Sequence, residues 1–402
     1  MNIVTTPEQL STAIDSLKNA SVLAIDTEFM REKTYYPKLC LLQIAGDDKT
    51  YLVDPISQDL DLTPLAQLWT NSATKVLHAG GQDLKILFDA CGAAPRPYFD
   101  TQDAATLIGQ SEQLGYAALV EHLLKVKLDK ADGFTDWAKR PLSKDQLKYA
   151  CEDVSYLLKL YPRILAELKS LGRENWLAAE FDQRSSPQAL TVDVRTQFRR
   201  LKRVTSLKPH QLAIAREVAA WRELEAQRRD QPKRWLLSDE ATLEICRRAP
   251  SKVSELENLR GVGANLRHSL GDIVAAVADG KNCPREDWPK LPERRRLSAE
   301  DSVAVELMAA VVRKRSSENR LSSSVLASRA MLEEYLHNRS EKSAIMQDWR
   351  KEIIGDEISR LLKGEVCLHL RGNRLVIEDY RAESGRSDNK NGDEKSTQTG
   401  CC

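Results

Sequence analysis

The sequence predicts an α/β domain, in which helices flank a mixed β-sheet, followed by two all-helical domains. Short apolar runs of strand length alternate with helical patterns up to about residue 80, and helical patterns alone follow. A chain of 402 residues also exceeds the size of one hydrophobic core. Residues 1–170 hold 18 basic against 23 acidic residues, a net charge of −5, whereas residues 195–235 hold 12 against 4, a net charge of +8. An acidic part suited to cations is thus joined to a basic part suited to polyanions.

The composition excludes several classes of protein. Hydrophobic residues make up 42% of the chain and charged residues 30%, which are ordinary values for a globular protein. No apolar run approaches the roughly 20 residues of a membrane helix, and the N-terminus lacks a signal-peptide pattern. We therefore expect a cytoplasmic protein without membrane contact. The eight cysteines include no Cys-x-x-Cys pair, which indicates reduced thiols, and we treat the terminal pair Cys401 and Cys402 as incidental.

The expected sheet can be outlined from the apolar runs. Five strands are predicted, at residues 3–4, 22–29, 39–45, 50–53 and 75–78. The turn Gly46-Asp47-Asp48 is short enough for a hairpin, so the strands around it are expected to form an antiparallel meander. Thr6 and Pro7 begin a helix, and a further helix is expected at residues 62–69.

Two carboxylates follow the apolar run that ends at Ile25. Asp26 and Glu28 are spaced by two residues, so both lie on the same face of the predicted strand. Two like charges at the end of a buried strand oppose each other's ionisation unless a cation lies between them. Oxygen ligands favour Mg²⁺ or Mn²⁺. The alternative is a solvated strand end without a metal.

A second informative stretch lies near residue 150. Ser143 and Gln146 form a capping box, which begins a helix that carries Tyr149 and Asp153. These two residues are four apart, so the phenol and the carboxylate lie on one face. The alternative is a half-buried core aromatic beside an exposed helix acid. Farther upstream, Gly80 and Gly81 let the backbone turn into a helix that carries Asp83.

These residues resemble a known family. Asp26-Thr27-Glu28, Asp83, and Tyr149 with Asp153 resemble the three exonuclease motifs of the DEDD superfamily, tyrosine subclass, and the segments 78–83 (HAGGQD) and 136–142 (DWAKRPL) narrow the resemblance to ribonuclease D. The resemblance implies a ribonuclease-H-like fold over residues 1–175. It also implies hydrolysis with two divalent ions, Mg²⁺ or Mn²⁺, that releases nucleoside 5′-monophosphates from a 3′ end.

The resemblance also implies a role for each motif residue. Asp26 is expected to bridge the two metals, and Glu28 and Asp153 to complete the first metal site. Asp83 is expected to act on the second metal through water. Tyr149 is expected to hydrogen-bond the attacking water; its unperturbed hydroxyl titrates near pH 10, so positioning suits it better than general-base catalysis.

The second half divides into a connector at 176–206, a domain at 207–282, a Pro/Arg linker at 283–297, a second domain at 298–379 and a disordered tail at 380–402. The first domain resembles the HRDC module, a helical nucleic-acid-binding domain, through segments 230–239 (DQPKRWLLSD) and 259–263 (LRGVG). The second resembles it loosely, because it lacks the Pro-Lys-Arg-Trp run.

Several residues are candidates for contact with nucleic acid, each with a structural alternative. Phe29 could stack on the terminal bases, although core packing fits it equally. The candidates for phosphate contact also suit solvated surfaces, and they are Lys139, Arg140, Arg228, Arg229, Lys233 and Arg234.

The sequence therefore predicts a metal-dependent 3′-to-5′ exoribonuclease that acts on structured RNA with a 3′ extension. The family resemblance implies precursors of transfer RNA as substrates, and no obligate protein partner is evident. A 3′-to-5′ DNA exonuclease with the same site is one alternative, because no residue that reads a 2′-hydroxyl can be named. A non-catalytic RNA-binding or helicase-associated protein is the other, and the four carboxylates argue against it.

Overall fold

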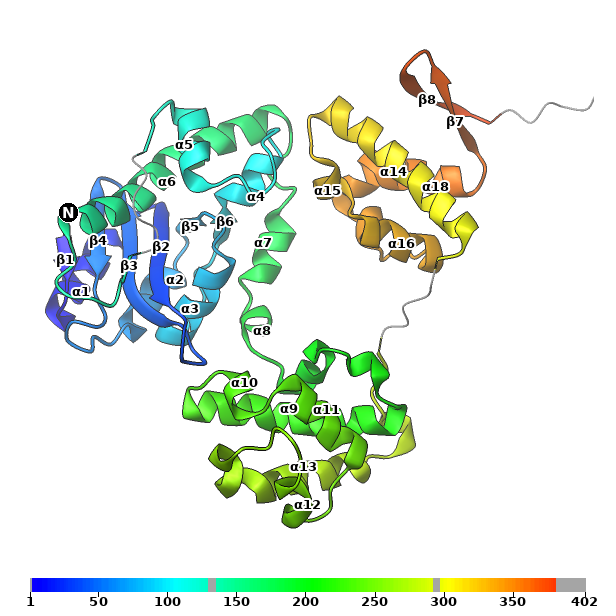
Figure 1. The fold of residues 1–402 in the computed structure, drawn as a ribbon. Helices are drawn as coiled ribbons and strands as arrows, with labels where there is room; N and C mark the ends of the chain where they lie inside the picture. Colours follow the sequence, from blue (N-terminus) through cyan, green and yellow to red (C-terminus); the bar gives the residue numbers. More distant parts are fainter. Residues whose placement is uncertain (1, 129–134, 292–296, 381–402) are drawn as a thin grey trace, which may run out of the picture. The chain divides into compact units, whose positions relative to one another are not determined.

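The computed structural model describes residues 2–128, 135–291 and 297–380 (Figure 1). These residues fall into two compact units. The first runs from the N-terminus to the linker that precedes Leu297 and includes Arg320–Ser322, and the second comprises the rest. The tail expected at 380–402 lies almost wholly outside the described residues. No helix in the described ranges is both long and apolar enough to cross a membrane.

The first unit contains a six-stranded mixed sheet with the strand order β1-β4-β3-β2-β5-β6. Its strands are β1 (Asn2–Val4), β2 (Val22–Met30), β3 (Lys38–Gly46), β4 (Lys49–Val53), β5 (Thr74–Leu77) and β6 (Tyr98–Asp100). The expected meander is confirmed, since β2, β3 and β4 pair antiparallel in chain order. Strand β5 runs parallel to β2, which makes the sheet mixed.

Strand β6 differs from the sequence prediction, which expects only helices beyond residue 80. It is only three residues long, Tyr98–Asp100, and pairs parallel with β5. Such a short strand carries no alternation that could be recognised. Its pairing with β5 places Asp100 beside the turn at Ala79 and Gly80, which leads into the helix that begins at Gly81.

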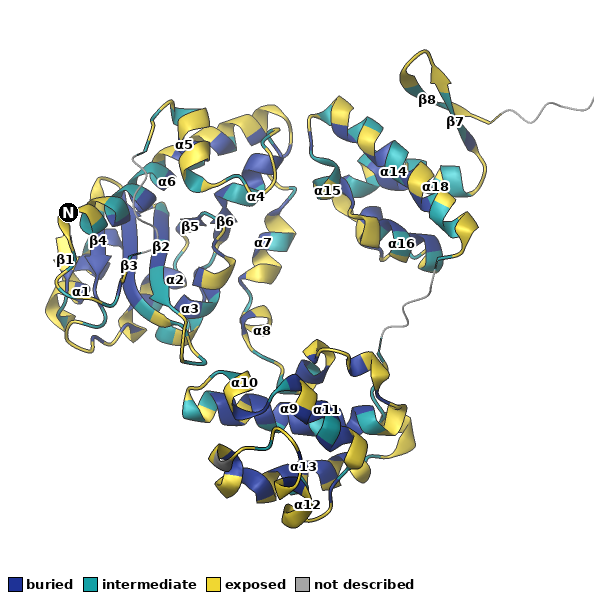
Figure 2. Ribbon diagram, in the orientation of Figure 1, coloured by how far each residue is buried: buried dark blue, intermediate teal, exposed yellow. Residues whose placement is uncertain are grey.

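The helices of this domain cover the sheet and leave its middle strands largely buried (Figure 2). They are α1 (Pro7–Leu17), α2 (Ala66–Trp69), α3 (Gly81–Cys91), α4 (Thr101–Thr106), α5 (Tyr116–Leu124) and α6 (Lys144–Ser170), with a 3-10 helix at Thr63–Leu65. Helix α6 packs on β2, β3 and β4. The expected capping box at its start is present, because Ser143 Oγ accepts from Gln146 N at 3.1 Å and Gln146 Oε1 accepts from Ser143 N at 2.9 Å.

The first helical domain follows within the same unit. Its helices are α9 (Pro209–Arg229), α10 (Lys233–Leu236), α11 (Asp239–Arg248), α12 (Val253–Glu257) and α13 (Leu270–Lys281), with 3-10 helices at Ala264–Ser269 and Arg285–Asp287. Helices α9 and α13 approach closely at Gly280, where a Cβ would lie 2.4 Å from the Cα of Ile214. A side chain at position 280 would therefore push the two helices apart.

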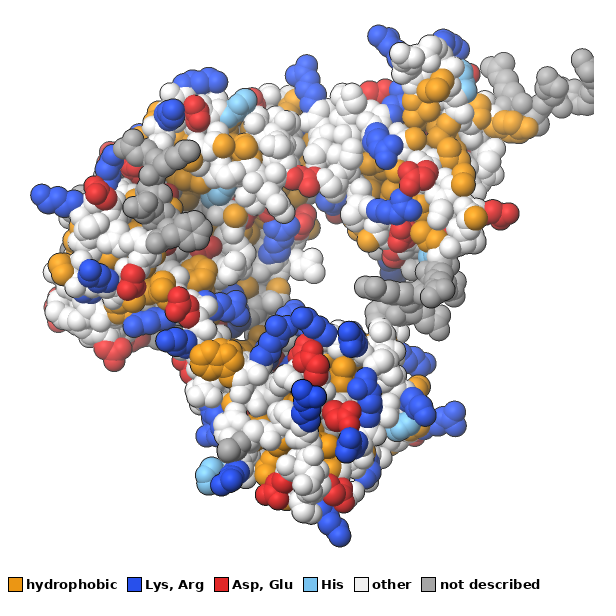
Figure 3. All heavy atoms as spheres, in the orientation of Figure 1, with side chains coloured by type: hydrophobic (Ala, Val, Ile, Leu, Met, Phe, Trp, Pro, Cys, Tyr) orange, Lys and Arg blue, Asp and Glu red, His pale blue; other side chains and the backbone are white. Residues whose placement is uncertain are grey.

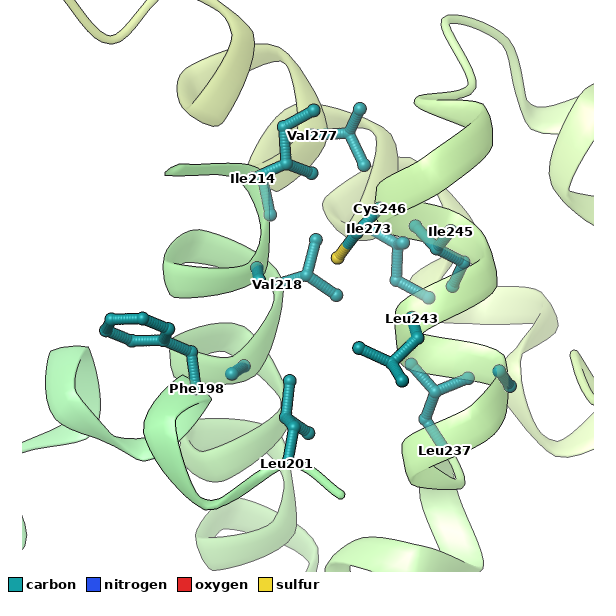
Figure 4. Close-up of a cluster of buried hydrophobic side chains, with 14 of the residues drawn as sticks. Phe198, Leu201, Ile214, Val218, Leu237, Leu243, Ile245, Cys246, Ile273 and Val277 are labelled. Atoms are coloured by element: carbon teal, nitrogen blue, oxygen red, sulfur yellow. The ribbon is translucent and has the colours of Figure 1, made fainter. Parts of the chain in front are cut away.

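The segment between the two domains is also helical. It contains α7 (Ala178–Arg184), α8 (Pro187–Leu190) and 3-10 helices at Val194–Arg200 and Val204–Ser206. Phe198, Leu201, Val204 and Leu207 belong to the buried core of the first helical domain (Figure 4). The second part of the expected connector therefore contributes to that core.

One loop of the α/β domain is hydrogen-bonded to the first helical domain. The backbone N–H groups of Tyr35 and Tyr36 both donate to Asp230 Oδ1 at 3.0 Å. The Tyr35 hydroxyl donates to Glu223, a buried carboxylate of α9. The two domains are therefore joined by polar contacts as well as by the chain.

The second unit is helical up to Leu362 and ends in a β-hairpin. Its helices are α14 (Ala299–Asn319), α15 (Ser323–Leu326), α16 (Arg329–Asn338), α17 (Asp348–Arg350) and α18 (Asp356–Leu362), with a 3-10 helix at Ala344–Met346 and a π-helix at Lys351–Gly355. Strands β7 (Val366–Arg371) and β8 (Arg374–Asp379) pair antiparallel. The expectation of an all-helical domain up to residue 379 is wrong at this hairpin.

The hairpin had a visible sequence signal. Apolar and polar residues alternate from Val366 to Leu370, and Gly372-Asn373 follows, a turn-forming pair in which Gly372 adopts a φ of +62°. Because helices surround this segment, the change in its hydrophobic period from 3.6 residues to 2 residues is hard to distinguish in the sequence.

Candidate active site

Three carboxylates from two separate segments meet at the centre of the sheet. Asp26 and Glu28 come from β2 and Asp153 comes from α6, and one ligand oxygen of each lies within 4.8 Å of the others. The spacing of Asp26 and Glu28 places both on the face that α6 covers, as the sequence predicts. A β-bulge between Glu28 and Phe29 shifts the register of the pairing with β3 immediately after the acidic pair.

The fourth predicted acid approaches the same group from α3. Asp83 is buried, and Thr27 donates a hydrogen bond from its hydroxyl to Asp83 Oδ1. Asp83 lies close enough to Asp26 and Glu28 for its charge to raise the pKa of both. All four carboxylates predicted from the sequence are therefore neighbours.

The turn into α3 is held by a carboxylate that the sequence reasoning missed. Asp100 accepts hydrogen bonds from Ala79 N and Gly80 N, both at 3.0 Å, and from the Tyr98 hydroxyl at 2.5 Å. Ala79 adopts a φ of +54°, an unfavourable conformation for a residue with a Cβ. Asp100 thus fixes the turn that brings Asp83 to the site. The available signal was an acid directly after the apolar pair Tyr98-Phe99.

A second missed residue supports Asp153. The Tyr116 hydroxyl, from α5, hydrogen-bonds the backbone carbonyl oxygens of Glu152 and Asp153, at 2.9 and 2.6 Å. Burial and the charges of Asp153 and Asp26 raise the pKa of Tyr116, which therefore stays protonated and donates. No motif spacing in the sequence pointed to this contact, because α5 and α6 are separated by a long loop.

Burial raises the pKa of every carboxyl in the group, and the charges of the other acids in the group raise the pKa values of Asp26 and Glu28 further. For Glu28 the pKa rises to about 8, first through burial and then through the charges of Asp153 and Asp83. For Asp153 it rises to about 7, again mainly through burial. The pKa of Asp26 rises well above its ordinary range, through burial and through the charges of all three other acids. The group therefore carries its full negative charge at neutral pH only with a cation beside it.

The donor set fits a hard divalent cation. All the converging side chains offer carboxylate oxygens, which Mg²⁺ and Mn²⁺ prefer. Asp153 Oδ2 is buried and has no hydrogen-bond partner among the described residues. A buried carboxylate oxygen without a donor is rare in folded proteins unless it binds an ion or water.

Tyr149 lies beside Asp153, one helical turn away. Its hydroxyl hydrogen-bonds the Asp153 carboxylate, and its ring packs against Trp137 at a centroid distance of 6.0 Å. Burial, and then the charges of Asp153, Glu28 and Asp26, raise the pKa of the phenol. The hydroxyl is therefore a proton donor at neutral pH, which is consistent with a positioning role.

The residues expected to bind substrate near the active site differ in accessibility. Phe29 is half-buried at the end of β2, and Lys139 is exposed. Arg140 donates to both oxygens of the buried Asp54, at 2.6 and 2.7 Å, and to the carbonyl oxygens of Cys40 and Trp137. Arg140 thus has a structural role that the sequence did not indicate.

Of the four basic candidates in the first helical domain, three form ion pairs within the domain and two are exposed. Arg228 and Arg229 both pair with Glu225, and Lys233 pairs with the buried Glu223 at 2.7 Å. Arg228 has a 69% exposed side chain, and Arg234 is exposed. Lys and Arg side chains are numerous on the face of this domain seen in Figure 3.

A pocket of about 590 Å³ in the first unit connects the start of α3 with α10. Its lining is rich in basic and aromatic side chains. These are Arg31, Lys85, Arg200, Lys233, Arg234, Tyr35, Tyr36 and Trp235. Gly81 and Gln82, which precede Asp83 in α3, also line it. The pocket therefore begins on the helix that carries a catalytic acid.

Comparison with known proteins identifies the class. Residues 1–169 match the family model described as 3′-5′ exonuclease, and residues 211–277 match the HRDC domain. Ribonuclease D of Nitrobacter hamburgensis is 36% identical over 379 residues, which cover 94% of this chain and 99% of the relative. Ribonuclease D of Granulibacter bethesdensis is 34% identical, with 93% and 96% covered. The crystal structure of Escherichia coli RNase D has a TM-score of 0.78 at 28% identity, covering 90% of this chain and 99% of that one.

The fold and the carboxylate group thus define a 3′-5′ exonuclease, an enzyme that hydrolyses phosphodiester bonds. The likeness to these relatives extends over nearly the whole chain, so its substrate class is RNA. The chain belongs to the ribonuclease D family. The HRDC match covers the first helical domain; a second HRDC domain at 298–379 stays a prediction.

The raised pKa values predict that a divalent cation stabilises the protein most at alkaline pH. Without metal, the folded state holds protons on Glu28 and Asp153 up to pKa values of about 8 and 7, whereas the unfolded chain releases them near 4.5 and 3.8. The free energy of unfolding therefore falls as pH rises from about 5 to 8. We expect the melting temperature in EDTA to be several degrees lower at pH 8 than at pH 6, and Mg²⁺ to raise it more at pH 8. Scanning fluorimetry measures both. The Asp26→Asn variant, with one acid fewer, is expected to show a weaker dependence on pH, and an equal dependence would contradict this origin.

The Arg140 contacts predict a large structural effect of its replacement. Arg140→Met leaves the buried Asp54 unpaired, which costs roughly 3 kcal/mol of unfolding free energy. The exposed neighbour provides the control, since Lys139→Met is expected to change stability by less than about 0.5 kcal/mol. Urea denaturation measures both values. Wild-type stability of Arg140→Met together with weakened RNA binding would instead assign Arg140 to phosphate contact.

Proposed function

We propose that this enzyme trims the 3′ ends of structured RNAs, precursors of transfer RNA among them, with two divalent ions. The observation that carries this proposal is the convergence of Asp26, Glu28, Asp83 and Asp153 in one buried group. The solved relative from Escherichia coli is described as an exoribonuclease involved in structured RNA processing, which supports the same substrate class here.

The carboxylates hold the reacting phosphodiester through the ions. When bound, the two divalent ions would supply an activated water and stabilise the leaving 3′ oxygen. Asp26 interacts with the charges of all three other acids, which supports a bridging role for it. Glu28 and Asp153 are the partners of Asp26 on one side. Asp83, oriented by the Thr27 hydroxyl, serves the other side.

Tyr149 orients the attacking water. Its hydroxyl is protonated at neutral pH because burial and three nearby acids raise its pKa. Its one O–H donates to the Asp153 carboxylate, so the neutral phenol oxygen orients the water by accepting a hydrogen bond from it and does not take up its proton. The Asp153 carboxylate, which accepts from this hydroxyl, keeps the phenol in position. The products are nucleoside 5′-monophosphates, as expected from attack at the last phosphodiester bond.

The basic pocket that includes Trp235 lies along the path we propose for the RNA strand. Arg31, Lys85, Arg200 and Arg234 supply positive charge to the pocket. Trp235 is 56% exposed, so its ring is available for stacking on a base. Charge and stacking are independent of base identity, as suits an enzyme that removes successive nucleotides. None of these contacts reads a 2′-hydroxyl, so they do not by themselves distinguish RNA from DNA.

The decisive assay compares substrates with the same 3′ end. A transfer RNA precursor with a 3′ extension is expected to be shortened one nucleotide at a time with Mg²⁺ and left intact with EDTA, while the matched DNA strand is cleaved slowly. Asp153→Asn is expected to lower the rate by about 10³-fold or more, a loss of several kcal/mol of transition-state stabilisation. Tyr149→Phe, which keeps the ring, is expected to lower it about 10²-fold. Gel analysis of end-labelled strands measures the rates. Faster cleavage of DNA, or wild-type rates in either variant, would refute the proposal.

The position of Trp235 in the pocket predicts that its ring contributes to the binding of a long RNA and not to the hydrolysis of a dinucleotide. Trp235→Ala is expected to raise the Kd for a 20-nucleotide RNA about tenfold, because one stacked base is worth about 1–3 kcal/mol. Hydrolysis of a dinucleotide, whose two bases both adjoin the scissile bond, is expected to be unchanged. Leu224→Ala removes another exposed apolar side chain of the same domain, outside the pocket, and serves as the control. Fluorescence anisotropy gives the Kd values, and equal binding by both variants would exclude Trp235 from the path.

A further inference from the structure

Gln43, in the middle of β3, has a buried side-chain amide without a partner. Its side chain is 0% exposed, and neither Oε1 nor Nε2 has a hydrogen-bond partner among the described residues. Burying an unsatisfied amide costs about 1–3 kcal/mol. A hydrophobic side chain of similar size would avoid this cost, so the amide at this position calls for a functional explanation.

The strand register places this amide next to the catalytic carboxylates. In the antiparallel pairing of β2 and β3, Gln43 lies directly opposite Asp26. Directly opposed residues project from the same face of a sheet, with Cβ atoms about 4.5–5.5 Å apart. The face that carries Asp26 is covered by α6, which packs on β2, β3 and β4 and brings Asp153 to the group.

The remaining neighbours of Gln43 on this face are apolar. Leu41 and Ala45 precede and follow it by two residues on β3, and Leu52 lies opposite it on β4. Leu41 and Leu52 pack against Ala150 of α6 in one buried cluster. Of the residues directly beside Gln43 on this face, Asp26 is therefore the one that can accept a hydrogen bond from the amide; Glu28 lies diagonally, two residues farther along β2.

We propose that Gln43 is a positioning residue of the metal site: its amide N–H, which has no partner among the described residues, donates to the Asp26 carboxylate when a divalent cation is bound and keeps that carboxylate in the orientation that holds the cation. This inference rests on the metal-dependent function proposed above. Asp26 has the most acidic neighbours of the group, so its orientation determines how all of them share a cation. Residues that orient ligands in this way typically change metal affinity 10- to 100-fold when replaced.

The test separates this role from a merely structural one. Gln43→Met keeps the length of the side chain and removes both polar atoms. We expect it to weaken binding of Mn²⁺ by about tenfold or more in calorimetric titration, with Mn²⁺ alone as the ligand. The melting temperature of the metal-free variant is expected to equal or exceed that of the wild type, because an unsatisfied buried amide has been removed.

A second buried glutamine offers the matched control. Gln197 is also buried, but its Nε2 donates to the carbonyl oxygen of Asp193 at 3.0 Å, outside the exonuclease domain. Gln197→Met is expected to lower the melting temperature and leave Mn²⁺ binding unchanged. Unchanged Mn²⁺ affinity in Gln43→Met, or a lower melting temperature as its sole effect, would overturn the role of Gln43. Failure of the wild type to bind Mn²⁺ would instead refute the metal-dependent function itself.

Discussion

The repulsion among four buried carboxylates is the constraint on which the rest of the exonuclease domain depends. Without other interactions these carboxylates would separate or take up protons, as their raised pKa values indicate. They belong to Asp26, Glu28, Asp83 and Asp153. The domain holds them together with interactions that do not involve a cation. A strand fixes the first two, a capped helix fixes the last, and hydrogen bonds from Thr27 and within the turn at Asp100 fix the third. Under the metal-dependent function proposed above, relief of this repulsion would give the site its affinity for a divalent ion.

Most of the catalytic group could be predicted from the sequence because its signals are local. The two-residue spacing of Asp26 and Glu28, and the four-residue spacing of Tyr149 and Asp153, each define a shared face once the element type is known. The capping box at Ser143 fixed where the helix begins. The meander was equally predictable, since a short polar turn separates two apolar runs.

The contacts that could not be predicted are long-range or too short to show periodicity. Arg140 pairs with Asp54, 86 residues away, so its sequence context gave no hint of a structural role. Strand β6 has three residues, and its carboxylate acts through backbone N–H groups of another segment. The environment of Gln43 follows only from the register of β3 against β2 and β4. In each case the missing information was which segments become neighbours.

The hydrogen bonds from the Tyr35 loop to Asp230 and Glu223 show that this loop of the exonuclease domain depends on the first helical domain for its partners. The Glu223 carboxylate is buried, and it accepts hydrogen bonds from Tyr35 and Lys233. Cutting the chain after residue 206 would leave the Tyr35 loop without its acceptors, and this loop lines the pocket beside α3. A chain cut there therefore loses contacts that hold this loop, although residues 1–169 alone match the exonuclease family model. Replacing the first helical domain with a different domain would remove these acceptors, so the Tyr35 loop would have to change together with it.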